Sequence, residues 1–222
     1  MSTLYIVATP IGNLEDITLR AIRVLKEVST VFCEDTRTTR VLLNKYDIKT
    51  ATESFHAQSP LSKMDRIQEL LEAGKDIALV SDAGTPGISD PGMLLVSEIR
   101  NRLPDTKVIA IPGASALTAA ISIAGKPLHE FVFVGFLPHK KGRQTLFEEM
   151  KVSDRPYIFY ESPHRIEKTL ESLKEVGKKV TILRELTKIH ESYVSGTAEE
   201  VLATFVNDPQ TLRGEFVVIV SD

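Results

Sequence analysis

The densest cluster of turn-forming residues lies in the segment SDAGTPGISDPG, residues 81–92. From Asp82 to Gly92, five of the eleven residues are Gly or Pro, so the segment is stiff yet open to close approach by a ligand. The carboxylates of Asp82 and Asp90 can accept hydrogen bonds from ribose hydroxyls or from an amine. The segment follows an apolar run and precedes a helical pattern, where α/β proteins bind ligands. We therefore predict a ligand-binding loop, with a rigid connector containing an Asx turn as the simpler alternative.

Two other loops have a similar character. TPIGN, residues 9–13, ends the first apolar run, and PGAS, residues 112–115, follows a later one. Both are expected to line the same site as residues 81–92. For Ser115 the alternative is a capping role at the start of the next helix.

Acidic and basic side chains follow the second apolar run, in CEDTRTTR, residues 33–40. Glu34, Asp35 and Arg37 at a strand end suit binding or proton transfer. The alternative is a helix N-terminus, with Asp35 or Thr36 as its cap and acids near the positive end of the helix dipole. Cys33 is expected to be a small buried apolar residue.

Histidines and a basic loop complete the candidates. His56 follows a short strand, and His164 with Arg165 follows another, but neither histidine has the spacing of a metal ligand, so no metal site is predicted. Residues 138–143, PHKKGR, either bind phosphates or form a solvated turn.

Alternating strand and helix patterns must position these loops. In the first half the expected strands are residues 4–8, 31–33, 53–55, 77–80 and 108–111, and the expected helices 17–28, 38–46, 63–73, 91–103 and 114–124. In the second half the expected strands are 131–136, 157–160, 180–183, 192–195 and 215–220, and the expected helices 166–176 and 198–205. The prediction is an α/β chain with two lobes, 1–113 and 114–222, the first built on a mostly parallel sheet and the second on a mixed sheet.

Composition narrows the function classes. The 222 residues include 27 Lys and Arg against 30 Asp and Glu, a net charge of −3, which argues against a generally basic nucleic-acid binder but leaves room for a local basic patch. A single cysteine excludes a disulfide framework. No long apolar run and no signal-peptide pattern are present, so we expect a cytoplasmic protein that does not span a membrane. Phosphate-loop and dinucleotide-binding glycine motifs are missing as well.

Six segments in order carry a resemblance to a known family: PIGN, CEDTRTT, SDAGTPGISDPG, PGAS, YESPHR and GEFVVIV. Over residues 3–220 the chain resembles the ribosomal small-subunit RNA 2′-O-ribose methyltransferases of the tetrapyrrole methylase superfamily. The resemblance implies a homodimer of two-lobed α/β chains that binds S-adenosylmethionine between the lobes. It also implies a cytidine ribose in the decoding region of 16S rRNA, in the 30S subunit, as the methyl acceptor.

The resemblance assigns site residues as well. The implied cofactor-binding residues are Pro10, Ser81, Asp82, Ala83, Ile88, Ser115, Ala116, Tyr160, Leu186, Gly214, Glu215 and Phe216. A ribose hydroxyl is a poor nucleophile, so a proton acceptor should help; the candidates are Glu34, Asp35, His56 and Glu161. The candidate phosphate-binding residues are Arg37, Lys140, Lys141, Arg143 and Arg165.

Two other functions stay open. A methylase acting on carbon of a tetrapyrrole ring would share the fold and cofactor, but it would need a wide apolar trough, whereas the basic loop and the polar segments favour a polyanion. A non-catalytic RNA-binding module for ribosome assembly would need no proton acceptor. Family members often continue beyond the last strand, while this chain stops at Asp222, so we expect weaker RNA binding if such a region helps to hold RNA.

Overall fold

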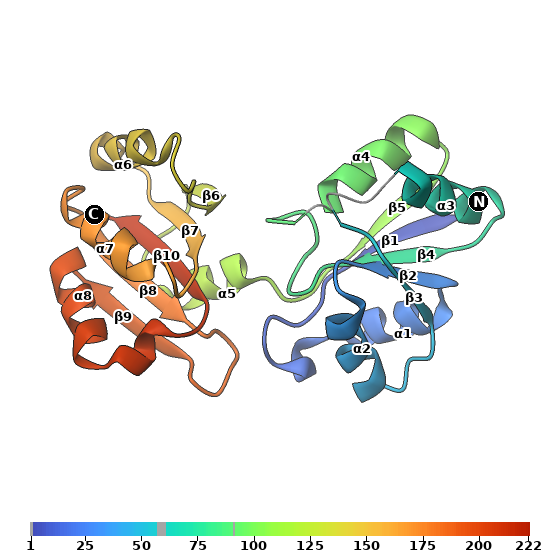
Figure 1. The fold of residues 1–222 in the computed structure, drawn as a ribbon, viewed down its shortest axis with the longest axis horizontal. Helices are drawn as coiled ribbons and strands as arrows, with labels where there is room; N and C mark the ends of the chain where they lie inside the picture. Colours follow the sequence, from blue (N-terminus) through green and yellow to red (C-terminus); the bar gives the residue numbers. More distant parts are fainter. Residues whose placement is uncertain (1, 57–60, 91) are drawn as a thin grey trace. The chain divides into compact units, whose positions relative to one another are not determined.

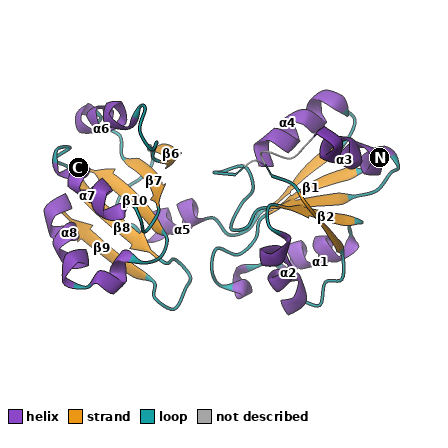
Figure 2. Cartoon of the chain, in the orientation of Figure 1, coloured by secondary structure: helices purple, strands orange, loops and turns teal. Residues whose placement is uncertain are grey.

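The computed structural model describes residues 2–56, 61–90 and 92–222. The chain divides into two compact units, Met1–Ser115 and Ala116–Asp222. Each unit is an α/β structure with its own five-stranded sheet (Figures 1 and 2). The α/β fold class predicted from the sequence is confirmed.

The first unit is built on a parallel sheet. Its strands are β1 (Thr3–Val7), β2 (Thr30–Cys33), β3 (Ala51–Ser54), β4 (Ile77–Val80) and β5 (Lys107–Ile111). They are ordered β3-β2-β4-β1-β5, and every neighbouring pair is parallel. The residues of β2 and β4 are all buried, as expected for central strands covered on both faces.

Helices cover the two faces of this sheet (Figure 1). The helices are α1 (Leu19–Glu27), α2 (Thr36–Lys45), α3 (Leu61–Glu72) and α4 (Gly92–Arg102), with a short 3-10 turn η1 (Leu14–Asp16) before α1. One core cluster joins the sheet to α1 and α2, and a second joins it to α3 and α4. The start predicted for α4, Pro91, lies outside the described residues.

The second unit has a mixed sheet, as predicted. Its strands are β6 (Val132–Phe136), β7 (Tyr157–Glu161), β8 (Lys179–Arg184), β9 (Ser192–Gly196) and β10 (Phe216–Ser221). Their order is β6-β7-β10-β8-β9; β6 and β7 are parallel, and the other pairs are antiparallel.

The helices of the second unit are α5 (Ala116–Ile123), α6 (Arg143–Val152), α7 (Ile166–Lys174) and α8 (Ala198–Asn207), with a 3-10 turn η2 (Pro209–Leu212). A single core cluster packs α6, α7 and α8 against the sheet, while α5 contacts β10. The capping box between Thr197 and Glu200 begins α8 at the predicted place. Helix α6 is absent from the sequence prediction. It follows Gly142 in the left-handed conformation, without the side-chain cap that usually marks a helix start.

Candidate functional site

The carboxyl ends of the parallel strands in the first unit bring three predicted loops together. Thr9, after β1, forms a two-way backbone bridge with Gly84, after β4, with N–O distances of 2.9 and 3.0 Å. The Thr9 hydroxyl also donates to the carbonyl of Ser81 at 3.0 Å. The third loop joins through Thr85, whose hydroxyl donates to the carbonyl of Ala114 at 3.1 Å. Thus hydrogen bonds join the loops carrying Pro10, Ser81 and Ser115 into one cluster, in which Pro10 and Ser81 are buried.

Gly84 is the residue at which this joint is tightest. Its φ of +82° lies in the left-handed region. A Cβ atom there would lie 3.2 Å from Cγ2 of Ile11 and 3.6 Å from the carbonyl oxygen of Ala114. Glycine is therefore required both for the backbone conformation and for the close approach of the loops.

The two aspartates of the glycine-rich loop have different surroundings. Asp90 accepts from the backbone N–H of Gly87 and of Gly92, at 2.8–2.9 Å, so it folds its own loop. Asp82 is exposed and accepts from the N–H of Asp35 at 3.1 Å. Of this pair, Asp82 is therefore the more exposed aspartate; its neighbour Ala83 is exposed too, as is Ile88 further along the loop.

Asp35 has the capping role that was the alternative at the sequence level. Its side chain caps α2 by accepting from the N–H of Arg37 at 2.8 Å, and it forms an ion pair with the Arg37 guanidinium at 2.6 Å. These contacts lower the pKa of Asp35 to about 2. Such a carboxylate is a weak proton acceptor, which argues against Asp35 as the base. The Arg37 guanidinium is exposed but already paired with Asp35.

Glu34 differs from its neighbour. It is half-buried, and burial, followed by the nearby negative charges of Asp82 and Asp90, raises its pKa. A carboxylate with a raised pKa holds a proton more readily, which suits a general base. Of the two carboxylates after β2, Glu34 therefore has the better properties for proton transfer.

His56 lies beside this edge of the sheet. It is exposed and follows Phe55, whose N–H donates to the carbonyl of Cys33 at 2.7 Å. His56 is therefore the residue next to a backbone contact with the end of β2, although it lies far from β2 in the sequence. Cys33 is completely buried, as expected.

In the second unit, other predicted residues meet at the edge where β7 and β8 end and β10 begins. Tyr160 pairs with Val217, and Phe216 pairs with both Glu161 and Arg184. The Tyr160 hydroxyl accepts from the N–H of Leu117 at 3.2 Å. This contact brings Tyr160 to the first turn of α5, which begins at Ala116.

Glu185, the residue after β8, is joined to Glu215, the residue before β10. Its N–H donates to the carbonyl of Glu215, and its carboxylate accepts from the Glu215 N–H, both at 2.9 Å. Gly214 has a φ of +105°, and a Cβ there would lie 2.5 Å from the Glu185 side chain, so only glycine fits. Leu186, the next residue along, is buried.

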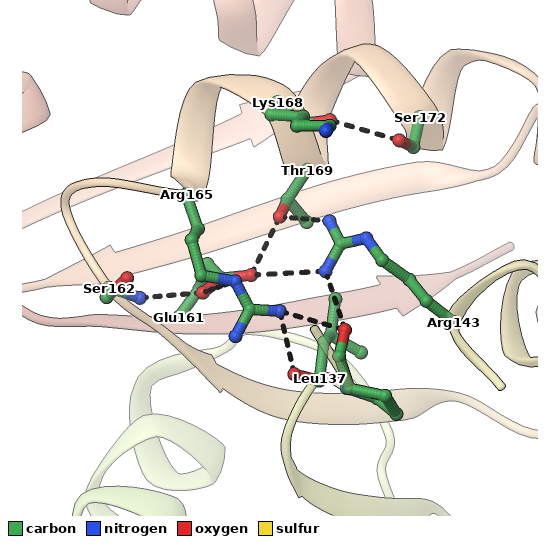
Figure 3. Close-up of polar contacts among 9 residues, drawn as sticks. Leu137, Arg143, Glu161, Ser162, Arg165, Lys168, Thr169 and Ser172 are labelled. Atoms are coloured by element: carbon green, nitrogen blue, oxygen red, sulfur yellow. Dashed lines mark hydrogen bonds and ion pairs between the residues drawn. The ribbon is translucent and has the colours of Figure 1, made fainter. Parts of the chain in front are cut away.

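Glu161 is not placed as a proton acceptor for a substrate (Figure 3). Its side chain has no exposed surface and forms ion pairs with Arg165 at 3.4 Å and Arg143 at 3.9 Å. It also accepts from the Thr169 hydroxyl at 2.7 Å and from the Ser162 N–H at 2.8 Å. This environment argues against the predicted role of Glu161 as a base. It argues likewise against Arg143 and Arg165 as phosphate-binding residues, because both guanidiniums contact buried groups of the protein.

The basic loop itself is open to solvent. Lys140 and Lys141 are both exposed, as is His139 before them. Within residues 2–56, 61–90 and 92–222, no group of three His, Cys, Asp or Glu is arranged to hold a metal ion. Among the helices of the same residues, none has the length and apolar character that a membrane crossing requires.

Several residues of these sites were not predicted individually from the sequence. Thr9 and Thr85 lie within loops that were predicted, but their hydroxyl contacts were not, and Thr169, Arg184 and Glu185 lie outside every predicted motif. Arg184 is buried and donates to the carbonyls of Arg213 and His190, which fixes the turn before β10. A charged residue ending an apolar strand is the only local hint of such a role.

Comparison with known proteins identifies the class. The family model described as Tetrapyrrole (Corrin/Porphyrin) Methylases matches residues 3–202. Among solved structures, diphthine synthase has a TM-score of 0.74 at 14% identity, covering 99% of this chain and 90% of that one. The methyltransferase CobJ has a TM-score of 0.71 at 19% identity, covering 100% of this chain and 95% of that one. At these identities the structural matches establish the fold alone.

Relatives with much higher identity narrow the class. A protein of Thermotoga maritima named ribosomal RNA small subunit methyltransferase I is 44% identical over 100% of this chain and 99% of its own length. Proteins of the same name from Halalkalibacterium halodurans and Bacillus subtilis are 48% and 42% identical, over 98% and 99% of this chain and 75% of their own lengths. The chain therefore belongs to the tetrapyrrole methylase family, in the branch of the ribosomal RNA small subunit methyltransferases I. The predicted resemblance is confirmed, and the chain is a methyltransferase.

Proposed function

We propose that this chain transfers a methyl group from S-adenosylmethionine to the 2′-oxygen of a cytidine ribose in 16S rRNA. The observation that carries the proposal is the identity of 42–48% over essentially the whole chain to relatives named ribosomal RNA small subunit methyltransferase I. The connected loops at the carboxyl edge of the first sheet supply the matching site.

The residues of this edge fit S-adenosylmethionine chemically. The cofactor carries a positively charged sulfonium, an amine and ribose hydroxyls. Asp82 offers an exposed carboxylate to these groups. Gly84 keeps the loop backbone close to the neighbouring loops. A solved uroporphyrin-III C-methyltransferase from Thermus thermophilus with this fold, at a TM-score of 0.66, was obtained with S-adenyl homocysteine.

Cofactor contact is proposed for Pro10, Ser81, Asp82, Ala83, Ile88 and Ser115 in the first unit. For the second unit the same role is proposed for Ala116, Tyr160, Leu186, Gly214, Glu215 and Phe216. When bound, S-adenosylmethionine supplies a methyl group on an electron-poor sulfur. The protein has to align the ribose oxygen with that carbon at about 3–3.5 Å, and this positioning is its main contribution to the rate.

Glu34 is proposed as the acceptor of the ribose hydroxyl proton, with His56 as the second candidate. Methyl transfer forms an O–C bond and breaks the S–C bond, and the hydroxyl proton must leave. A half-buried carboxylate with a raised pKa can take that proton, whereas Asp35 is held as an ion pair. Proton removal by such a group is worth about 10²–10⁴ in rate.

The RNA partner is proposed to be held by the exposed cations Lys140 and Lys141, with Arg37 as a further exposed cation that is paired with Asp35. A net charge of −3 makes the distribution of these cations more important than their number. We further propose that the chain acts in the cytoplasm as a homodimer, in which two copies of the basic loop can contribute to one RNA-binding surface.

Parallel methyl-transfer assays separate this proposal from the two alternatives. The chain is incubated with labelled S-adenosylmethionine and either 30S subunits, free 16S rRNA or a uroporphyrin precursor. We expect label in RNA and none in the tetrapyrrole. Label only in the tetrapyrrole would support a carbon methylase, and RNA binding with no transfer to any acceptor would support a non-catalytic module.

A further inference from the structure

The buried carboxylate of Glu161 is surrounded by more positive charge than it neutralises. Two guanidiniums, from Arg143 and Arg165, face this one carboxylate, while Thr169 and Ser162 donate the shortest hydrogen bonds to it. Burying an ion is costly unless it is paired and hydrogen-bonded. Because the Glu161 carboxylate is both ion-paired and hydrogen-bonded, the cluster is a fixed structural element. The guanidinium N–H groups that do not face Glu161 are available for other acceptors.

Those acceptors are two backbone carbonyls of the segment after β6. Arg165 Nη2 donates to the carbonyls of Leu137 at 2.7 Å and Pro138 at 3.2 Å (Figure 3). Arg143 Nη1 reaches the same Pro138 carbonyl at 3.5 Å, and its Nη2 donates to the Thr169 hydroxyl at 2.7 Å. The arginines therefore act as a bridge, with Glu161 on one side and the start of the basic loop on the other.

The anchored segment continues into the exposed part of the loop. Residues 139–142 are exposed, and a turn closes where the Arg143 N–H donates to the carbonyl of Lys140 at 3.2 Å. Phe136, just before the anchored carbonyls, keeps 53% of its surface exposed, and its ring packs edge-on against Tyr160. Exposed lysines and an exposed aromatic ring thus fall within the six residues 136–141, and such groups bind single-stranded nucleic acid through phosphate contacts and base stacking.

We infer that Glu161 is a positioning residue that holds residues 138–142 as a docking surface for single-stranded RNA. Glu161 orients Arg165 and Arg143, the arginines fix the carbonyls of Leu137 and Pro138, and the loop then presents Lys140 and Lys141 to the phosphates. This inference rests on the proposed RNA substrate. It gives the two arginines an indirect part in RNA binding.

The test compares loss of the anchor with loss of the lysines. The probe is a labelled single-stranded 16S rRNA fragment, and binding is followed by fluorescence anisotropy over a range of salt concentrations. The logarithm of the RNA binding constant falls linearly with the logarithm of the salt concentration. In the double variant Lys140→Ala, Lys141→Ala, the loss of two phosphate contacts should reduce the magnitude of this slope by about 1.4. We expect Glu161→Gln, like the double lysine variant, to lower both the affinity for RNA and the magnitude of this slope. The affinity for S-adenosylmethionine should stay unchanged. Glu167→Gln, which removes an exposed carboxylate from α7, is the matched control and should leave both unchanged.

Non-additivity is the decisive readout. If Glu161 acts through the lysines, adding Glu161→Gln to the double lysine variant weakens RNA binding by less than about twofold further. Fully additive losses would overturn the inference. So would a Glu161→Gln enzyme with reduced kcat and unchanged RNA affinity, because that result would return Glu161 to the chemistry.

A second variant and a second measurement keep the inference testable if Glu161→Gln does not fold or if the chain binds no RNA. Arg165→Lys keeps the charge but loses the forked contact with the two carbonyls, and it should weaken RNA binding in the same way. Hydrogen exchange needs no RNA: the amides of Arg143 and Leu146, which donate to Lys140 and Gly142, should exchange faster in either variant. Unchanged exchange would refute the anchor, whereas faster exchange in a chain without RNA affinity would refute only the proposed function.

Discussion

The backbone N–H of Asp35 donates to a carboxylate oxygen of Asp82 at 3.1 Å. The two residues follow neighbouring parallel strands, β2 and β4, and lie 47 positions apart in the sequence. The contact joins the acidic loop to the glycine-rich loop. It therefore sets the position of the carboxylate that we propose for the cofactor.

Replacing Asp82 should weaken cofactor binding. A hydrogen bond to a charged group contributes about 1.5–3 kcal/mol, so Asp82→Ala should raise the Kd for S-adenosylmethionine about 10- to 100-fold in a calorimetric titration. Asp82→Asn keeps an oxygen for the Asp35 N–H and should fall between wild type and Asp82→Ala. The control is Asp105→Ala, an exposed aspartate just before β5, at the opposite edge of the sheet. Equal affinities for Asp82→Ala and the control would remove Asp82 from the site.

Gly84→Ala should destabilise the chain more than Gly74→Ala. Both glycines have similar left-handed φ angles, +82° and +73°, so both variants incur about 1–2 kcal/mol of backbone strain. Only at Gly84 does the new methyl group approach other atoms, since nothing lies within 4 Å at Gly74. Thermal unfolding should show a lower Tm for Gly84→Ala, and only this variant should lose cofactor affinity. A Gly74→Ala variant with the lower Tm would contradict the close packing of the loops.

Glu34→Gln should change the pH dependence of stability. The pKa of Glu34 lies above its ordinary value of 4.5 in the folded chain, chiefly through burial. As pH rises, the unfolded chain therefore loses this proton first, and ionisation favours unfolding from about pH 4.5 upward, through the folded pKa. Glutamine has no such titration. The free energy of unfolding of the variant, minus that of the wild type, should therefore be larger at pH 7 than at pH 4. Denaturant unfolding at the two pH values measures this, and a relative gain at pH 4 instead would contradict the raised pKa.

Much of this architecture follows from the sequence. The apolar runs of β2 and β4 are short and fully buried, and that of β1 is largely buried, so periodicity and turn residues were enough to predict a parallel sheet. The glycine and proline content of residues 81–92 marked the loop that the structure joins to Thr9 and Ala114. Helix α6 was missed because Gly142 provides no capping side chain, and a helix start without a cap has no local signature.

Glu34 and Asp35, the adjacent carboxylates after β2, should differ in their effects on catalysis. Asp35→Asn keeps an oxygen to cap α2, so methyl transfer to 30S subunits should stay within about threefold of wild type. Glu34→Gln should lower kcat by about 10²-fold or more if it removes the general base, with little change in the Kd for S-adenosylmethionine. The pair is matched, because each variant replaces an acid by its amide at adjacent positions. The reverse order of effects would assign the proton to Asp35.

Side-chain roles were harder to predict than elements. Glu161 stands in a polar segment after a strand, which from sequence alone resembles a catalytic acid or base. Its partners Thr169 and Arg143 lie 8 positions after it and 18 before it, and only the packing of α6 and α7 on the sheet brings them together. Asp35 is the opposite case, because the helix-capping alternative drawn from its local sequence agrees with its contacts in the structure.

The position of the transferred methyl group on 16S rRNA distinguishes ribose methylation from methylation of a base. 30S subunits from cells lacking this activity are incubated with the chain and labelled S-adenosylmethionine, and the 16S rRNA is then digested with alkali. A methyl on a ribose 2′-oxygen blocks cleavage at that nucleotide, so we expect one labelled, alkali-resistant dinucleotide that begins with cytidine. Label in single nucleotides would mean base methylation and would contradict ribose transfer. No label in 16S rRNA at all would contradict the proposed function.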